Sequence, residues 1–232
     1  METYIIDADN IDGDLFFYNL TRNSNDFSML PIFELDHIAQ KIRNILKKHG
    51  SRKDIILNHR ELQEAFFSPF KPQLKNAQVF LSHSHADKNK ALEVKDYLES
   101  QTKHKVFIDL LFWDYKDDVL NELAEYDDIS KIEDAFTLIL RESLQDMIEK
   151  CPYFVFLQSK NSVSLNQDLL KITYSAWIYE ELRIANTFIA DTALQESRIK
   201  AMRISYDITN LLRRFKPISL NGLCNEIFST LL

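Results

Sequence analysis

From Gln78 onward, short apolar runs alternate with longer segments in which apolar residues recur at helical spacing. The runs Val79–Leu81, Val106–Ile108 and Tyr153–Leu157 have the length of strands, and the last is apolar throughout, as in a strand buried on both faces. The segment Asp87–Ser100 between the first two runs is typical of a helix. Strands that alternate with helices favour a parallel sheet covered by helices on both faces, with ligands bound outside the carboxyl ends of the strands.

Further elements complete this α/β pattern. We expect a long helix after Ser130, another over about Ser175–Phe188 and a last helix capped by Ser219. A weaker strand is predicted near Met202–Ser205.

Residues 1–76 are expected to form a separate N-terminal extension, mainly helical and of unknown function. Tyr4–Ile6 is typical of a short strand, and helices are predicted over Leu35–Leu46 and from Asn58 toward Phe67. Two prolines then interrupt the pattern, so the α/β domain is expected over residues 77–232.

The glycine content restricts how this chain could hold a nucleotide. Only Gly13, Gly50 and Gly222 occur. Phosphate-binding loops of the P-loop and Rossmann types need several glycines within one short turn. Neither loop is therefore present, and a nucleotide would have to be held in another way.

Charge and cysteine content indicate the compartment and exclude some partners. The net charge of −7 argues against broad, charge-driven nucleic-acid binding. Cys151 and Cys224 form neither a CxxC pair nor a disulfide framework, which favours a reduced, cytoplasmic setting. The chain shows no signal-peptide pattern and no apolar run of about 18 residues, so we expect no membrane association.

The spacing His83-x-His85-x-Asp87 resembles a zinc motif of metallo-β-lactamases. That motif normally continues with a histidine, but Lys88 stands there, and no histidine follows His104. We therefore expect no metal site. The alternative is that these polar residues simply end a strand and start a helix.

The same segment also resembles the first conserved box of the TIR (Toll/interleukin-1 receptor) family. In that box a strand with a Phe-Ile-Ser-like end enters a loop rich in Ser and Asp, and many bacterial members show a Ser-His-Ser start like Ser82, His83 and Ser84. The next strand, Val106–Asp109, followed by Trp113-Asp114, is similar to the second TIR strand and the start of its BB loop. The Arg-Asp-x-x-Pro-Gly loop of many animal and plant members is absent.

Two later segments extend the resemblance. Phe154–Ser159 followed by Asn161-Ser162 is similar to a TIR strand that ends in a Ser-x-Asn-Ser-like turn. The run Ser175-x-Trp177-x-x-x-Glu181-Leu182 is similar to the TIR pattern Ser-x-Trp-Cys-x-x-Glu-Leu, with Ile178 in place of Cys. The C-terminal Phe-Trp box is missing.

The resemblance implies a flavodoxin-like, three-layer TIR fold and, from the Trp/Glu pair, the NAD-cleaving type found in Thoeris-like antiphage defence. Glu181 would be the catalytic residue, with NAD+ as substrate and no cofactor. Residues expected to bind the substrate are Trp177, Ser175, Ser82, His83, Ser84, Asp109, Trp113 and Asp114.

The chemistry suits a single carboxylate. Nicotinamide leaves NAD+ as a neutral molecule, so no general acid is needed, whereas ordinary glycosidases use two carboxyl groups. Trp177 and Glu181 are four residues apart and share a helix face, while Glu180 lies about 100° away around the helix. Ser175 is expected to cap this helix, contact a hydroxyl, or do both.

Two functions from different classes follow from the resemblance. The first is an NAD+ glycohydrolase or ADP-ribosyl cyclase that makes a linear or cyclic ADP-ribose-type signal in bacterial antiphage immunity, with a separate effector protein reading the product. The second is a non-enzymatic TIR adaptor that acts by homotypic self-association. The Trp177/Glu181 pair favours the enzyme, and both functions imply a homo-oligomer built through TIR–TIR contacts.

Overall fold

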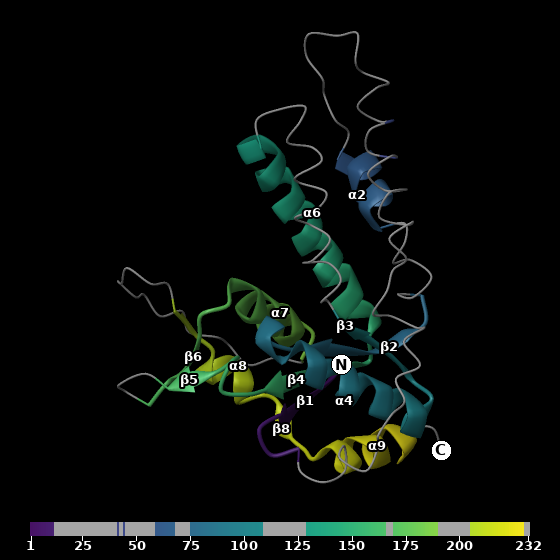
Figure 1. The fold of residues 1–232 in the computed structure, drawn as a ribbon, viewed down its shortest axis with the longest axis vertical. Coiled ribbons are helices and arrows are strands. Elements are labelled where there is room, and N and C mark those ends of the chain that lie inside the picture. The colour runs from purple at the N-terminus through teal and green to yellow at the C-terminus, as the bar shows by residue number, and fades with distance from the viewer. Residues whose placement is uncertain are drawn as a thin grey trace. The chain divides into compact units, whose positions relative to one another are not determined.

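The computed structural model describes Lys41, Asn44 and residues 1–11, 59–67, 75–108, 129–165, 169–189 and 205–229 (Figure 1). The chain divides into two compact units. The first comprises Met1–Asn19, Ala77–Ile108 and Leu144–Leu232, and the second comprises Leu20–Asn76 and Asp109–Ser143.

The first unit is built on a five-stranded sheet in which every strand pair is parallel. Its order is β3 (Lys105–Ile108), β2 (Ala77–Ser82), β4 (Tyr153–Gln158), β1 (Glu2–Asp7) and β8 (Lys216–Pro217). This confirms the parallel α/β sheet predicted from the alternation of strands and helices.

The first strand corrects the expected domain division. β1 pairs along its whole length with β4, from Glu2 opposite Tyr153 to Asp7 opposite Gln158. Residues 3–6 of β1 are all buried, so this strand needs neighbours on both edges and both faces. The expected separation of residues 1–76 from residues 77–232 therefore does not hold for β1, which completes the sheet between β4 and β8.

Helices cover the two faces of this sheet, as expected for three layers (Figure 1). On one face, α4 (Lys88–Thr102) packs beside α9 (Leu220–Ser229) over one apolar cluster. The strand residues of that cluster alternate along the chain, as a period of two requires. They include Tyr4, Ile6, Val79, Leu81, Val106, Ile108, Val155 and Leu157. Residues of the opposite set, such as Phe80 and Phe154, stack with ring centroids 5.4 Å apart, and α7 (Ala176–Thr187) covers that face.

A second sheet is small and antiparallel. It consists of β5 (Ser164–Leu165), β6 (Lys171–Thr173) and β7 (Tyr206–Asp207) in that order. The strand predicted near Met202–Ser205 begins outside the described residues, and the strand that is seen starts at Tyr206 and joins this small sheet.

The remaining elements are helical. They are α2 (His59–Phe67), η1 (His85–Asp87), α6 (Ile129–Lys150) and α8 (Thr209–Leu212). The helix predicted toward Phe67 is confirmed as α2. The cap predicted at Ser219 is also confirmed, because Ser219 Oγ accepts a hydrogen bond of 3.1 Å from the backbone N of Gly222 in the first turn of α9. No helix in the described ranges is long and apolar enough to cross a membrane.

Candidate functional site

The strand order places the strongest ligand position between β2 and β4. The chain passes from β2 through α4 to β3 on one side, and then returns through α6 to β4 on the other side of β2. In open parallel sheets, ligands bind at such a reversal, outside the carboxyl ends of the two strands. Here those ends are Ser82 and Gln158.

A buried hydrogen bond joins this edge to α7. Ser82 lies two residues after Phe80, on the sheet face that α7 covers, and is fully buried. Its Oγ donates to Glu181 Oε2 over 2.5 Å, and Glu181 is 1% exposed. The fold thus brings together two predicted site residues that are 99 positions apart in the sequence.

Helix α7 orients Glu181 through its cap and its apolar stripe. Ser175 caps the helix, because its Oγ accepts from Ile178 N over 3.2 Å. Ile178, Leu182 and Ala185 are buried, and Ile189, which continues their helical spacing, is partly buried. The same packing turns Glu181 inward.

Trp177 and Glu180 on α7 are more exposed than Glu181. Trp177, one turn earlier, is partly exposed. The Glu180 side chain is 16% exposed and lies 3.7 Å from the Arg183 guanidinium. Glu181 itself is fully buried.

The polar segment after β2 leads through η1 into α4. His83 is buried, Ser84 is partly buried and His85 is exposed. The Asp87 carboxylate accepts hydrogen bonds from Ser159 Oγ and from Asn161 Nδ2, the latter over 2.7 Å. Among the residues that the structure describes, no group of three His, Cys, Asp or Glu side chains is placed to hold a metal ion.

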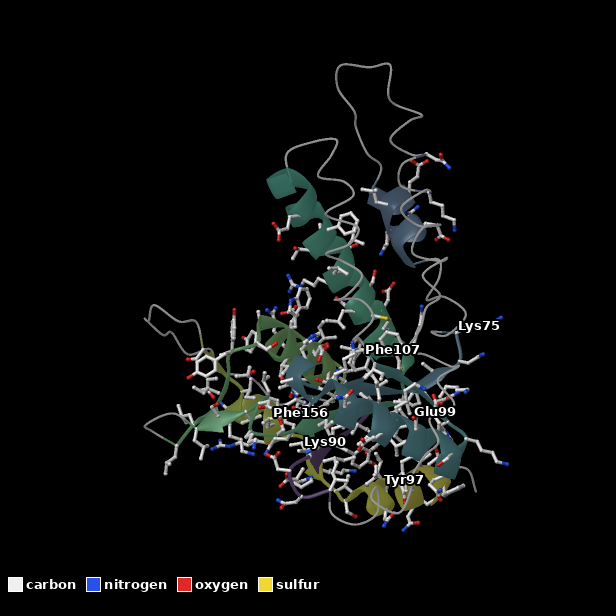
Figure 2. All side chains as sticks on the ribbon, viewed as in Figure 1. Lys75, Lys90, Tyr97, Glu99, Phe107 and Phe156 are labelled. Atoms are coloured by element: carbon white, nitrogen blue, oxygen red, sulfur yellow. The ribbon has the colours of Figure 1, made fainter. Side chains whose placement is uncertain are left out.

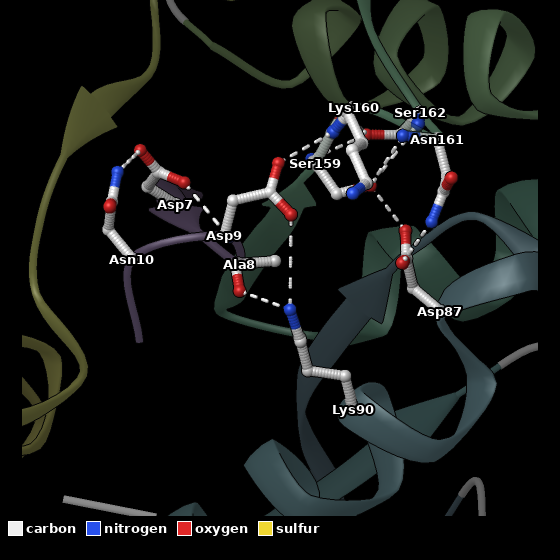
Figure 3. A network of polar contacts seen from close by, with 10 residues as sticks. All are labelled: Asp7, Ala8, Asp9, Asn10, Asp87, Lys90, Ser159, Lys160, Asn161 and Ser162. Atoms are coloured by element: carbon white, nitrogen blue, oxygen red, sulfur yellow. Dashed lines mark hydrogen bonds and ion pairs between the residues drawn. The ribbon is translucent and has the colours of Figure 1, made fainter. Parts of the chain in front are cut away.

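A polar network surrounds the carboxyl ends of β1 and β4 (Figure 3). Asp87 reaches the loop after β4 from one side, while Asp9, two residues after β1, accepts from Lys160 N over 2.9 Å. Lys90 of α4 donates to Ala8 O over 2.5 Å. The sequence motifs did not predict this network. The polar residues that directly follow the apolar strands β1 and β4 could have indicated it.

Three predicted substrate-binding residues, Asp109, Trp113 and Asp114, lie outside the described residues. The two cysteines are placed away from the Ser82–Glu181 pair: Cys151 precedes the amino end of β4, and Cys224 is on α9. Neither is positioned as a nucleophile for this edge of the sheet.

The described site thus combines an inward carboxylate, a hydroxyl bonded to it and an aromatic ring one helical turn away. Such a set can place negative charge beside a developing cation, and it lacks the second carboxyl group that an ordinary glycosidase uses. Comparison with known proteins found no matching family model, curated protein or solved structure.

Proposed function

We propose that this chain is a TIR-type NAD+ nucleosidase, a glycohydrolase or cyclase that cleaves the nicotinamide–ribose bond. The observation that carries the proposal is the hydrogen bond between Ser82 and Glu181 at the reversal of strand order. It unites the first and last of the TIR-like motifs at the position where parallel sheets bind ligands.

In this proposal, Glu181 provides the electrostatic stabilisation. The bond from nicotinamide nitrogen to ribose C1′ breaks, and its electron pair leaves with neutral nicotinamide. Positive charge that develops at C1′ is stabilised by the Glu181 carboxylate. Attack at C1′ by water, with loss of a proton, gives ADP-ribose, while attack by a nucleophilic atom of the same molecule gives a cyclic product.

Ser82 has a different role from the one expected from the sequence. Its Oγ–H is directed at Glu181 Oε2, so it orients the carboxylate and is not required to touch the substrate. Glu181 is 1% exposed, so contact with a ribose requires neighbouring side chains to move when NAD+ binds. In this proposal Trp177, partly exposed one helical turn before Glu181, provides an aromatic wall beside the ribose.

The test is direct. The purified protein is incubated at high concentration with NAD+, and the products are separated by mass-resolved chromatography. Free nicotinamide together with linear or cyclic ADP-ribose supports the proposal, and the ratio of the two distinguishes glycohydrolase from cyclase. A cyclic product would favour a signal that a separate effector protein reads in antiphage immunity.

Absence of cleavage at high protein concentration would refute the enzyme. If the protein self-associates but does not cleave NAD+, the non-enzymatic TIR adaptor becomes the better proposal, because an adaptor needs only the homotypic contact. Sedimentation of the same sample measures that self-association.

A further inference from the structure

A dinucleotide carries a diphosphate, and this chain has no glycine-rich loop that could surround one. With only three glycines in the sequence, a diphosphate would have to be bound by side-chain cations and isolated N–H groups. The lysines that the structure places near the carboxyl ends of β1 and β4 are Lys90, Lys160 and Lys171. All side chains of the described residues are drawn in Figure 2.

The loop after β4 is held in one conformation by Asp87. This carboxylate is 7% exposed and binds both Ser159 Oγ and Asn161 Nδ2. Inside the loop, Ser159 N donates to Ser162 Oγ over 2.8 Å, and Ser159 Oγ accepts from Asn161 N over 3.0 Å. Lys160 therefore lies between two residues that are both fixed to the segment after β2 (Figure 3).

The N-terminal segment fixes the same loop from the other side. Asp9 Oδ2 accepts from Lys160 N over 2.9 Å, and Asp7 Oδ1 accepts from Asp9 N over 3.0 Å. Ala8 N donates to Gln158 O over 2.7 Å, which continues the pairing of β1 with β4. The backbone around Lys160 is thus anchored by hydrogen bonds that reach two other segments of the chain, one after β1 and one after β2.

The ammonium groups of the three lysines differ in their contacts. Lys90 Nζ donates to a backbone carbonyl and lies 3.9 Å from Asp9, and Lys171 Nζ donates to Gln158 Oε1 over 3.3 Å. Lys160 is exposed, and its ammonium makes no hydrogen bond or ion pair with any residue in the described ranges. A cation on a pre-ordered backbone loses less conformational entropy on binding than one on a mobile loop.

We propose that Lys160 binds the diphosphate of the dinucleotide, an inference that rests on the proposed function. The loop that carries Lys160 follows β4, and β4 pairs directly with β2, where Ser82 lies opposite Phe156. The reactive ribose at Glu181 and the diphosphate at Lys160 would therefore both lie along the edge shared by β2 and β4. Asp87 and Asp9 act as positioning residues, because they fix the backbone that presents Lys160.

The experiment compares two substrates that share the same scissile bond. NAD+ carries the diphosphate, and nicotinamide riboside carries no phosphate. Lys160→Ala should raise KM for NAD+ about tenfold and leave kcat within about twofold, since one charge-assisted contact is lost. For nicotinamide riboside both parameters should be unchanged, and Lys160→Arg should restore KM for NAD+.

Lys150→Ala is the matched control. Lys150 is an exposed lysine at the end of α6, before the amino end of β4, so its removal should leave both substrates unaffected. Added salt should raise KM for NAD+ in the wild type and in the control more steeply than in Lys160→Ala.

Each outcome decides the inference. Equal KM values for NAD+ in Lys160→Ala and wild type, or equal losses on both substrates, would overturn it. If the wild type cleaves neither substrate, the proposed function fails, and calorimetric titration with ADP-ribose then tests Lys160 separately. Binding that Lys160→Ala weakens about tenfold would support the inference, and the absence of binding, or equal binding, would refute it.

Discussion

Replacing Glu181 with Gln removes one negative charge and keeps the shape of the side chain. The Gln amide oxygen can still accept the hydrogen bond that Ser82 Oγ donates to Glu181 over 2.5 Å. The wild-type carboxylate is 1% exposed, so water screens it weakly and its charge acts strongly on a nearby cationic centre. Losing one such electrostatic contact costs about 100- to 1000-fold in kcat.

Glu181 is buried, so its replacement also affects the stability of the fold. A hydrogen bond to a charged acceptor contributes about 1 kcal/mol more than one to a neutral acceptor. Removing a buried charge offsets this loss, since burying an ion is itself costly. We therefore expect Glu181→Gln to change the free energy of unfolding by about 1 kcal/mol or less, and urea unfolding measures it.

The matched control is Glu180→Gln on the same helix. The Glu180 carboxylate lies 3.7 Å from Arg183, whereas the Ser82 hydroxyl binds Glu181, so most of the rate should remain. The assay follows nicotinamide release from NAD+ at equal, high protein concentration. If Glu180→Gln were inactive and Glu181→Gln active, Glu180 would be the catalytic carboxylate instead of Glu181. If both variants were fully active, the catalytic group would lie elsewhere in the chain.

Four further predictions test the fold and the assembly. Lys103→Gly should raise the free energy of unfolding by about 1 kcal/mol, because Lys103 ends α4 at a φ of 59°, where glycine avoids the Cβ clash; lower stability in urea would contradict this. Burial raises the pKa of Cys151 to about 12 and that of Cys224 to about 11, so both thiols should react with thiol reagents far more slowly than in the unfolded chain. The stability contributed by the neutral thiols is complete below the pKa of 9.0 of a free thiol and is lost as the pH rises through 11 to 12. The free energy of unfolding should therefore fall between pH 9 and 12, which urea unfolding at increasing pH measures. From the TIR resemblance, specific activity should fall on dilution, with the segment of residues 110–118 expected from the sequence as the contact, and constant activity in monomeric protein would rule this out.

Local patterns in the sequence determined the α/β alternation and the orientation of α7. Apolar runs and helical spacing depend on near neighbours, so they predicted β1, β2, β3 and β4 and the Ser175 cap, but not the short strand β8. The same helical period separated Glu181, on the Trp177 face, from Glu180, which lies about 100° away around the helix.

Only the tertiary structure decided which distant segments meet. A strand's sequence shows that it needs partners but does not name them, and β1 was therefore assigned to a separate extension when it in fact pairs with β4. The burial of Glu181, its bond to Ser82 and the anchoring of Lys160 by Asp9 and Asp87 all depend on contacts between residues far apart in the chain. Such contacts arise from the packing of whole layers, so local periodicity carries no information about them.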